Sequence, residues 1–463
     1  MKSQYKLTIF YGKFIDIPSL KAGFRIRSSC AIGVNSESGS IVFIQENFHD
    51  DLLKLASNWD PNLKHDEVKI VDCNNNNNNN SYAFLFPGFV DTHIHASQYP
   101  NNGLFGKMSL LEWLNEYTFP LENKLKDLNI AKIVYSKVIE RTLSHGTTTA
   151  AYYATIHLES TKLLANLCSE YNQRSFIGKI CMNQNSPAYY VEPSTDTSIN
   201  LTKKFIEHIN SINNPKINAI ITPRFAPSCD KDLLCNLGKL AKQYELPIQT
   251  HLSENLNELE WVHDLFPEYA NYTEVYNQNG LLNEKTILAH CIYLNDLELN
   301  TIKSKNSGIA HCPISNSCLS SGLCSVRKFL NKGIKVGLGT DTSAGYTTSI
   351  LEVARHAHMV SRQLASVEGN DDCKISVTEC LYLATLGGAY VMGLQDQVGS
   401  FEVNKQFDCQ LINLTVEGSK IDLFPWDKET EKLEKWFFNG DDRNVQAVWV
   451  GGQECGIRSK SYL

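Results

Sequence analysis

Two different rhythms of apolar and polar residues divide the chain. Up to about residue 84, short runs rich in β-branched and aromatic residues predict strands at Tyr5–Tyr11, Ser40–Gln45 and Lys69–Asp72. From Phe84 onward, strand-like runs alternate with helix-like segments, which is the pattern of successive βαβ units. The chain therefore begins with a small β-rich part and continues into a larger α/β part.

The second part contains eight strand-like runs. Helical patterns lie between most of them, for example at Leu201–Ile212, Lys231–Tyr244 and Asn257–Phe266. Eight strands with intervening helices predict a (β/α)8 barrel of the TIM type, with its active site at the C-terminal ends of the strands. A doubly wound open sheet is the alternative, but no GxGxxG follows the first strand. The predicted strands are Phe84–Thr92, Thr147–Tyr152, Ser175–Met182, Asn218–Thr222, Pro247–His251, Thr286–His290, Gly308–His311 and Lys335–Gly339.

The end of the chain returns to strand-like patterns. Val398–Ile412 and Val445–Trp449 read as strands that pair with those of the N-terminus. We therefore expect residues 1–84 and 394–463 to form one small β-sandwich domain, and residues 85–393 to form the barrel. The run Asn74–Asn80 favours turns and solvated loops, and is predicted to be a surface insertion.

Composition narrows the function. Of 463 residues, 42% are hydrophobic and 20% charged, as is usual for globular proteins, and the net charge of −7 gives no reason to expect a nucleic acid partner. No secretory signal is evident, and no apolar run approaches the ~20 residues of a membrane helix. The 14 cysteines include no CxxC pair. Scattered cysteines of this kind favour a reduced, cytosolic compartment.

The strongest local signal is PGFVDTHIH, residues 87–95. In a β-strand, residues i and i+2 point to the same face, so His93 and His95 project together into the mouth of the barrel. Two imidazoles on one face can bind one metal ion. A lone His-x-His pair is weak evidence, because such pairs also arise by chance.

Three more residues at strand ends strengthen this signal. His251 ends the fifth predicted strand, His290 ends the sixth, and Asp341 closely follows the eighth. Each of them taken singly reads as a hydrogen-bonded rim residue, but several strand ends that agree favour a catalytic metal site. His311, at the end of the seventh strand, is predicted to be structural or to orient a ligand residue.

Two further features concern how the metal is used. Glu254 lies three residues after His251, where a carboxylate can move the proton of a water held by the metal. Glu258 and Glu260 are predicted to lie on the solvated face of a following helix. The fourth strand ends in Thr222-Pro223-Arg224, without a lysine that could bridge two metals, which predicts a single ion.

From these residues the chain resembles the amidohydrolase superfamily, and its wider motifs resemble the guanine deaminases. The similarity runs from about Phe84 to Gly393 and continues weakly through residues 398–400. The first sixty or so residues and the asparagine run lie outside the family pattern. The motifs are PGFVDTHIHASQY (87–99), TPRFAPSC (222–229), THLSEN (250–255), LAHCIYL (288–294), AHCPISNSCLSSG (310–322) and GLGTDTSAGY (337–346).

The resemblance implies hydrolysis of guanine to xanthine and ammonia with one zinc ion per chain, in a homodimeric enzyme. It implies that Asp341 and His290 orient and deprotonate the attacking water, and that Glu254 delivers a proton to the ring. The implied zinc ligands are His93, His95, His251 and Asp341. The implied contacts of the base are His95, Gln98, Arg224, Phe225, His251, Glu254 and Asp341.

The hydrogen-bonding and stacking properties of these side chains support the implied contacts with guanine, but they do not exclude other substrates. An arginine fork matches the O6/N7 edge of guanine, as it does in DNA recognition, Phe225 can stack on the ring, and Gln98 can bond another ring edge. Without the family match, Arg224 would read as a salt-bridged rim residue. The zinc cytidine deaminase class is excluded, because its P-C-x-x-C signature is missing. Another amino-purine, an aminated triazine and a pyrimidine stay open as substrates.

A non-catalytic interaction protein is the rival from a different class. The tail Ser461-Tyr462-Leu463 fits the loose carboxyl-terminal form that PDZ domains bind. A retained metal set together with Glu254 favours catalysis instead.

Overall fold

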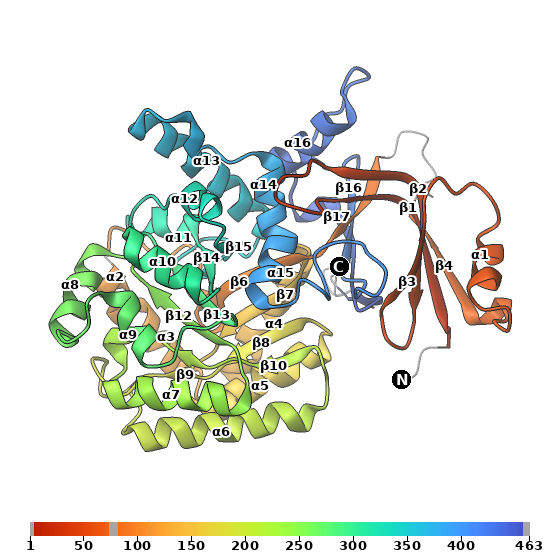
Figure 1. The fold of residues 1–463 in the computed structure, drawn as a ribbon. Coiled ribbons are helices and arrows are strands. Elements are labelled where there is room, and N and C mark those ends of the chain that lie inside the picture. Colours follow the sequence, from red (N-terminus) through yellow and green to blue (C-terminus); the bar gives the residue numbers. More distant parts are fainter. Residues whose placement is uncertain (1–3, 74–81, 109, 457–463) are drawn as a thin grey trace.

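The computed structural model describes residues 4–73, 82–108 and 110–456, and contains a closed barrel of parallel strands (Figure 1). Eight strands follow one another around it in chain order, and every neighbouring pair is parallel. This confirms the predicted α/β barrel. The strands are β6 (Phe89–His95), β7 (Thr147–Tyr153), β8 (Arg174–Gly178), β10 (Ile217–Ala219), β12 (Ile248–Leu252), β13 (Thr286–His290), β14 (Gly308–His311) and β15 (Lys335–Leu338).

The barrel closes along one seam, between β10 and β12. A single bridge joins Ile221, just beyond β10, to Ile248 in β12. Two backbone hydrogen bonds of 2.9 Å hold it, from Ile221 N to the carbonyl of Pro247 and from Gln249 N to the carbonyl of Ile221. The short pair β9 (Ile180–Cys181) and β11 (Thr222–Pro223) continues the strands beyond β8 and β10.

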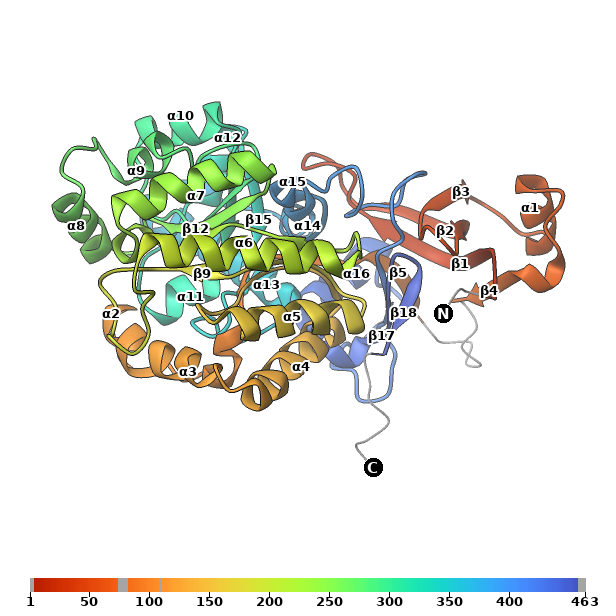
Figure 2. The same ribbon diagram turned by 90° about the horizontal axis from the view of Figure 1, so that it is seen from below.

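Amphipathic helices surround the barrel (Figure 2). In α7, for example, the N-cap Asp230 accepts a hydrogen bond from Leu233 N, and a stripe of leucines spaced three or four residues apart is buried. Helix α1 (Leu52–Trp59) lies away from the barrel, beside the N-terminal strands (Figure 1). The other helices are α2 (Leu110–Trp113), α3 (Phe119–Lys124), α4 (Leu128–Ser144), α5 (Leu158–Glu170), α6 (Thr195–Ile212), α7 (Lys231–Tyr244), α8 (Leu256–Leu265), α9 (Tyr272–Gln278), α10 (Asp296–Ser304), α11 (Pro313–Cys318), α12 (Val326–Asn331), α13 (Ile350–Glu368), α14 (Val377–Tyr382), α15 (Gly388–Met392) and α16 (Glu429–Asn439).

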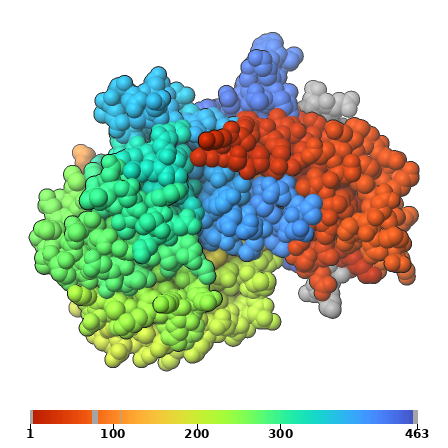
Figure 3. All heavy atoms as spheres, in the orientation of Figure 1, coloured from red at the N-terminus to blue at the C-terminus, as the bar shows by residue number. Residues whose placement is uncertain are grey.

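Strands from both ends of the chain form a second sheet beside the barrel. Figure 3 shows the C-terminal segments in blue between the barrel and the red N-terminal strands. The order is β18-β17-β16-β5-β1-β2-β3, and β4 also pairs with β1. Its arrangement as a β-sandwich, and domain boundaries at residues 84 and 394, stay predictions. The strands are β1 (Leu7–Asp16), β2 (Arg25–Asn35), β3 (Ile41–Gln45), β4 (Val68–Asp72), β5 (Ala83–Pro87), β16 (Cys409–Asn413), β17 (Val445–Val450) and β18 (Gln453–Cys455).

Several predicted strands differ from those in the structure. The run 84–92 is two strands: β5 pairs with β16 in the second sheet, and β6 begins the barrel after Gly88. A Cβ on Gly88 would lie 2.1 Å from Thr148 Oγ1, so glycine permits this change of sheet. Of the predicted strand 398–412 only β16 is a strand, and β2 was not predicted. The asparagine run and the C-terminal tripeptide lie outside the described residues.

The helical run Asp371–Met392 is long and apolar enough to cross a membrane by length and composition alone. The sequence analysis did not single out this run. In this structure, 72% of its most apolar window is buried. Among the described residues it is the one run that meets this criterion. Leu386, Ala389 and Val391 of this run pack against apolar residues of the barrel strands, so its apolar character is that of a core helix.

Candidate metal centre and substrate pocket

The two histidines of the His-x-His motif lie at the C-terminal end of β6. Both point to the same face of the strand and both are buried. Asp91, two residues earlier, accepts hydrogen bonds from His93 N (3.2 Å), Thr340 N (3.1 Å) and Thr340 Oγ1 (2.6 Å). These bonds fix the end of β6 against the segment that carries Asp341. The buried Asp91 was not singled out in the sequence.

Four side-chain atoms converge on one point above the barrel. His93 Nε2 lies 3.2 Å and His95 Nε2 3.4 Å from Asp341 Oδ1, and the Nε2 atoms of His95 and His251 are 3.2 Å apart. In a tetrahedral zinc site with bonds of about 2.0–2.1 Å, neighbouring donor atoms are about 3.3–3.4 Å apart. These three distances therefore match the spacing of donors around a tetrahedral metal ion. Two overlapping groups, His93-His95-His251 and His93-His290-Asp341, each bring three ligand atoms within 4.8 Å of one another.

The protonation of the histidines suits the same purpose. His251 Nδ1 lies 2.7 Å from the carbonyl oxygen of Arg224, which only accepts, so Nδ1 carries the proton and Nε2 keeps its lone pair. Burial lowers the pKa of His93, His95 and His251 below the ordinary value, so the imidazoles are neutral, as metal ligands must be. Both ring nitrogens of His93 are buried without a hydrogen bond. A metal ion would satisfy Nε2.

A second group of titratable side chains lies beside this cage. His290 Nε2 is 3.8 Å from Asp341 Oδ2 and 3.4 Å from Glu254 Oε2, and its Nδ1 lies 2.9 Å from Asn316 Oδ1. Burial raises the pKa of Glu254 to about 7, although the neighbouring His290 opposes this shift. Glu254 therefore exchanges a proton near neutral pH, which suits a general acid or base.

Glu258 differs from its prediction. It is buried rather than solvated, because its carboxylate caps the start of α8: Oε2 accepts from Glu254 N (2.9 Å) and Asn255 N (3.2 Å). Oε1 accepts from the hydroxyl of Tyr272 at 2.9 Å. Glu258 thus holds the backbone that carries Glu254. Glu260 is exposed, as predicted.

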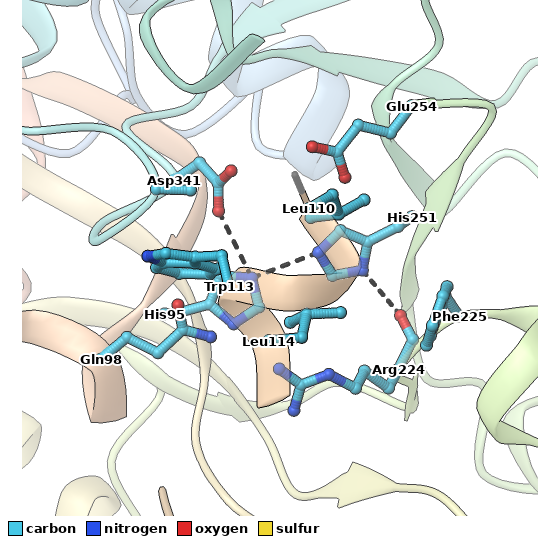
Figure 4. Close-up of a pocket in the computed structure, with 11 residues that line it drawn as sticks. His95, Gln98, Leu110, Trp113, Leu114, Arg224, Phe225, His251, Glu254 and Asp341 are labelled. Carbon is cyan, nitrogen blue, oxygen red and sulfur yellow. Dashed lines mark hydrogen bonds and ion pairs between the residues drawn. The ribbon is translucent and has the colours of Figure 1, made fainter. Parts of the chain in front are cut away.

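A pocket opens next to the cage (Figure 4). The structure brings to its wall all seven residues that were expected to contact a base: His95, Gln98, Arg224, Phe225, His251, Glu254 and Asp341. The rest of the wall was not predicted and comes from Leu110, Trp113, Leu114 and Ala344. Leu110 and Trp113 belong to the short helix α2 and Leu114 follows it, in a segment whose sequence carries no motif for chemistry.

Arg224 is bound by a partner that the sequence did not reveal. Its Nη1 donates to Glu122 Oε2 at 2.7 Å and its Nη2 to Glu122 Oε1 at 3.3 Å, and both side chains are buried. Burial alone would lower the pKa of Arg224, but the carboxylate beside it raises the pKa above its ordinary value. Arg224 is therefore both a salt-bridged residue and a charged part of the pocket wall.

Two other buried groups do not belong to the cage. His311 makes no hydrogen bond with either ring nitrogen, and burial lowers its pKa to about 3. Lys179, which directly follows β8, donates to Glu192 Oε1 at 2.6 Å and to the carbonyl of Ile180 at 2.9 Å. Its ammonium group therefore bonds these two partners and lies outside the cage.

The fold and the metal cage define a hydrolase of the metal-dependent barrel type. The model of the amidohydrolase family matches residues 84–455, and the chain belongs to this family.

Within this family, the chain is similar to proteins named as guanine deaminases. A protein named "Probable guanine deaminase" from Schizosaccharomyces pombe is 46% identical over 460 residues, covering 98% of this chain and 85% of the relative. The guanine deaminase of Dictyostelium discoideum is 42% identical, covering 98% and 99%. A crystal structure of guanine deaminase from C. acetobutylicum with bound guanine superimposes with a TM-score of 0.86 at 37% identity, covering 97% of this chain and 100% of that chain.

Proposed function

We propose that this chain is a zinc-dependent guanine deaminase, which hydrolyses the amine at C2 of guanine and releases xanthine and ammonia. The observation that carries the proposal is the cluster of donor atoms from His93, His95, His251 and Asp341, which lies beside a pocket lined by Arg224, Gln98 and Glu254. The similarity to guanine deaminases supports the choice of base.

The metal and its ligands are inferred from the donor atoms of the cage. His93, His95, His251 and Asp341 would hold one zinc ion, since nitrogen donors with one carboxylate at tetrahedral spacing suit zinc. When bound, zinc supplies Lewis acidity that makes water nucleophilic at neutral pH. Asp341 Oδ1 faces the cage, and Oδ2 faces His290. Asp341 Oδ2 and His290 Nε2 are thus placed to orient the water and take its proton.

Glu254, whose Oε2 lies 3.4 Å from His290 Nε2, would act on the ring nitrogen beside the reacting carbon. Its carboxyl would give a proton to ring N3, which lies next to C2, so that the ring accepts the electron pair as water adds. Ser321 Oγ lies 3.4 Å from Glu254 Oε1 and helps to hold the group. The amine then leaves as ammonia once it has taken the second proton, and the C2 carbonyl forms. Water supplies one oxygen and two hydrogens, so the reaction balances.

The base is recognised on the other wall of the pocket. The guanidinium of Arg224 would donate to the O6/N7 edge of guanine, and the ring of Phe225 would pack against the face of the base. Gln98 would bond the edge between O6 and C2. A homodimer, a cytosolic location and the absence of nucleic acid and membrane partners stay predictions from the sequence.

Ammonia release from a panel of amino-purines, amino-pyrimidines and aminated triazines tests the proposal. We expect guanine to have the highest kcat/KM. His251→Ala should abolish both zinc binding and turnover, whereas His263→Ala, at an exposed histidine of α8, should alter neither. A higher kcat/KM for a pyrimidine or a triazine would contradict the choice of guanine, while activity in zinc-free His251→Ala would contradict the metal mechanism.

A further inference from the structure

A single buried carboxylate organises the recognition side of the pocket. Glu122 in α3 has no exposed surface and does not line the pocket. Besides the two bonds from Arg224, its Oε1 accepts from Gln98 Nε2 at 2.9 Å and its Oε2 accepts from the Tyr190 hydroxyl at 2.7 Å. Each carboxylate oxygen thus accepts two hydrogen bonds, which fills its acceptor capacity.

These bonds fix the polarity of Gln98. An ionised carboxylate can only accept, so the amide nitrogen of Gln98 must face Glu122 and the amide oxygen must point away from it. Figure 4 shows the nitrogen of Gln98 on the side of Arg224 and the oxygen on the side of His95. The pocket wall therefore presents a hydrogen-bond acceptor from Gln98 beside donors from Arg224.

We propose that Glu122 is a positioning residue that sets base specificity: it orients Gln98 as an acceptor and Arg224 as a donor, so that the pair reads a ring N–H next to a carbonyl. This inference rests on the proposed deamination of guanine. In guanine, N1–H and O6 are such a pair. A ring with an unprotonated nitrogen at position 1 presents an acceptor to the Gln98 oxygen and is rejected.

The positions of Glu254 and Arg224 agree with the proposed role of Gln98 as an acceptor for N1–H. The reacting C2 lies between N1 and N3. Glu254 and Gln98 lie on opposite sides of the cage in Figure 4, so a base with N3 toward Glu254 places N1 toward Gln98. O6, next to N1, then lies toward Arg224. A single orientation of guanine therefore places N3 near Glu254, N1 near Gln98 and O6 near Arg224.

Glu122→Gln is expected to reverse the polarity of Gln98. The new amide nitrogen meets donors at either oxygen position. At the Oε2 position it faces Arg224 Nη1 at 2.7 Å, and a guanidinium cannot turn to accept. At the Oε1 position it replaces the longer Arg224 bond of 3.3 Å and faces Gln98, whose amide can flip. Gln98 would then point its nitrogen into the pocket.

The assay compares guanine with 2-aminopurine, which carries the same amine at C2 but has an unprotonated N1 and no oxygen at C6. In Glu122→Gln, the ratio of kcat/KM for guanine over 2-aminopurine should fall by about tenfold to a hundredfold relative to the unaltered protein, because a donor then faces N1–H. Zinc content should not change. An equal loss with both substrates would show that Glu122 is merely structural, and would overturn the proposal.

A double variant tests the polarity itself. In Gln98→Glu/Glu122→Gln, the amide at position 122 can donate to the carboxylate at position 98, which again turns an oxygen toward the pocket. Most of the guanine preference should return, and failure to recover it contradicts the proposal. Tyr190→Phe is the matched control: it removes one bond to Glu122 but none to Gln98 or Arg224, so the ratio should stay within about twofold.

Two further measurements distinguish failure of the Glu122 proposal from failure of the proposed function. If Glu122→Gln does not fold, Gln98→Leu decides the matter: loss of the acceptor must lower the same ratio, and an unchanged ratio overturns the proposal. If the unaltered protein releases ammonia from neither guanine nor 2-aminopurine, the proposed function itself fails. Normal guanine turnover with an unaltered ratio in the variants refutes the role of Glu122 alone.

Discussion

Replacement of Glu254 by glutamine separates proton transfer from metal binding. The amide keeps the shape of the buried carboxyl, and its oxygen can still bond Ser321 Oγ, which lies 3.4 Å from Oε1. The amide nitrogen would face His290 Nε2, 3.4 Å from Oε2. Burial lowers the pKa of His290, but the charges of Glu254 and Asp341 raise it above its ordinary value; the amide removes the charge of Glu254 and so favours the neutral imidazole. In that form, with the proton on Nδ1 toward Asn316 Oδ1, Nε2 can accept. The variant therefore leaves neighbouring groups satisfied and removes only the titratable proton.

The expected loss in kcat is about 10²- to 10⁴-fold, the usual size of a general acid or base contribution. This corresponds to about 2.7–5.4 kcal/mol in the activation barrier, at 1.36 kcal/mol per tenfold. Zinc content should equal that of the unaltered protein, because Glu254 is not one of the four cage residues. Steady-state ammonia release together with metal analysis measures both quantities.

The pH profile gives an independent readout of the same group. Burial raises the pKa of Glu254 to about 7, and the protonated form is the one that donates to the ring. Activity should therefore decline as the pH rises through the pKa of Glu254, and a nearby zinc cation moves this decline below pH ~7. Glu254→Gln should lack the decline. Near-normal kcat in the variant, or an unchanged profile, would refute the role of Glu254.

Three other measurements extend the test. Metal analysis should find one zinc per chain, chelation should abolish activity, and added zinc should restore it; two ions per chain would contradict the single cage. Arg224→Ala should reduce the ratio of kcat/KM for guanine over adenine by about tenfold to a hundredfold. It should also lower the free energy of unfolding by about 3–5 kcal/mol, because it leaves the Glu122 carboxylate buried without its cation. Asp408→Ala should cost a similar ~3–5 kcal/mol in denaturant unfolding, because Arg174, which donates to Asp408 at 2.9 and 3.1 Å, stays buried; unchanged stability would contradict this.

The cluster of donor side chains could be predicted because each of its four residues follows a rule of position. His93 and His95 share a face through the period of a β-strand, and His251 and Asp341 lie where parallel strands end. These rules depend only on local sequence and on the barrel. Predicting that the four donors converge therefore required no knowledge of how the helices pack.

Glu122 and Glu258 could not be predicted in the same way. Glu122 lies in α3, outside every recognised motif, and its role comes from contacts with residues that are distant in sequence. Glu258 is on a helix next to Glu254, where a charged residue usually faces solvent, but it turns back to cap the helix. The strand break at Gly88 was missed because both halves are apolar and only the tertiary fold assigns them to different sheets.

The seam of the barrel has a thermodynamic consequence for the metal. Arg224 lies just beyond one side of the seam and His251 on the other, and the bond from His251 Nδ1 to the Arg224 carbonyl crosses it. Opening of the seam would break this bond, which orients the His251 ring toward the other three donors. Since an ion then binds the closed form more tightly than the open one, metal occupancy and barrel closure are linked functions. Each must stabilise the other by the same free energy, so a bound ion would also stabilise the strand junction that a single bridge holds.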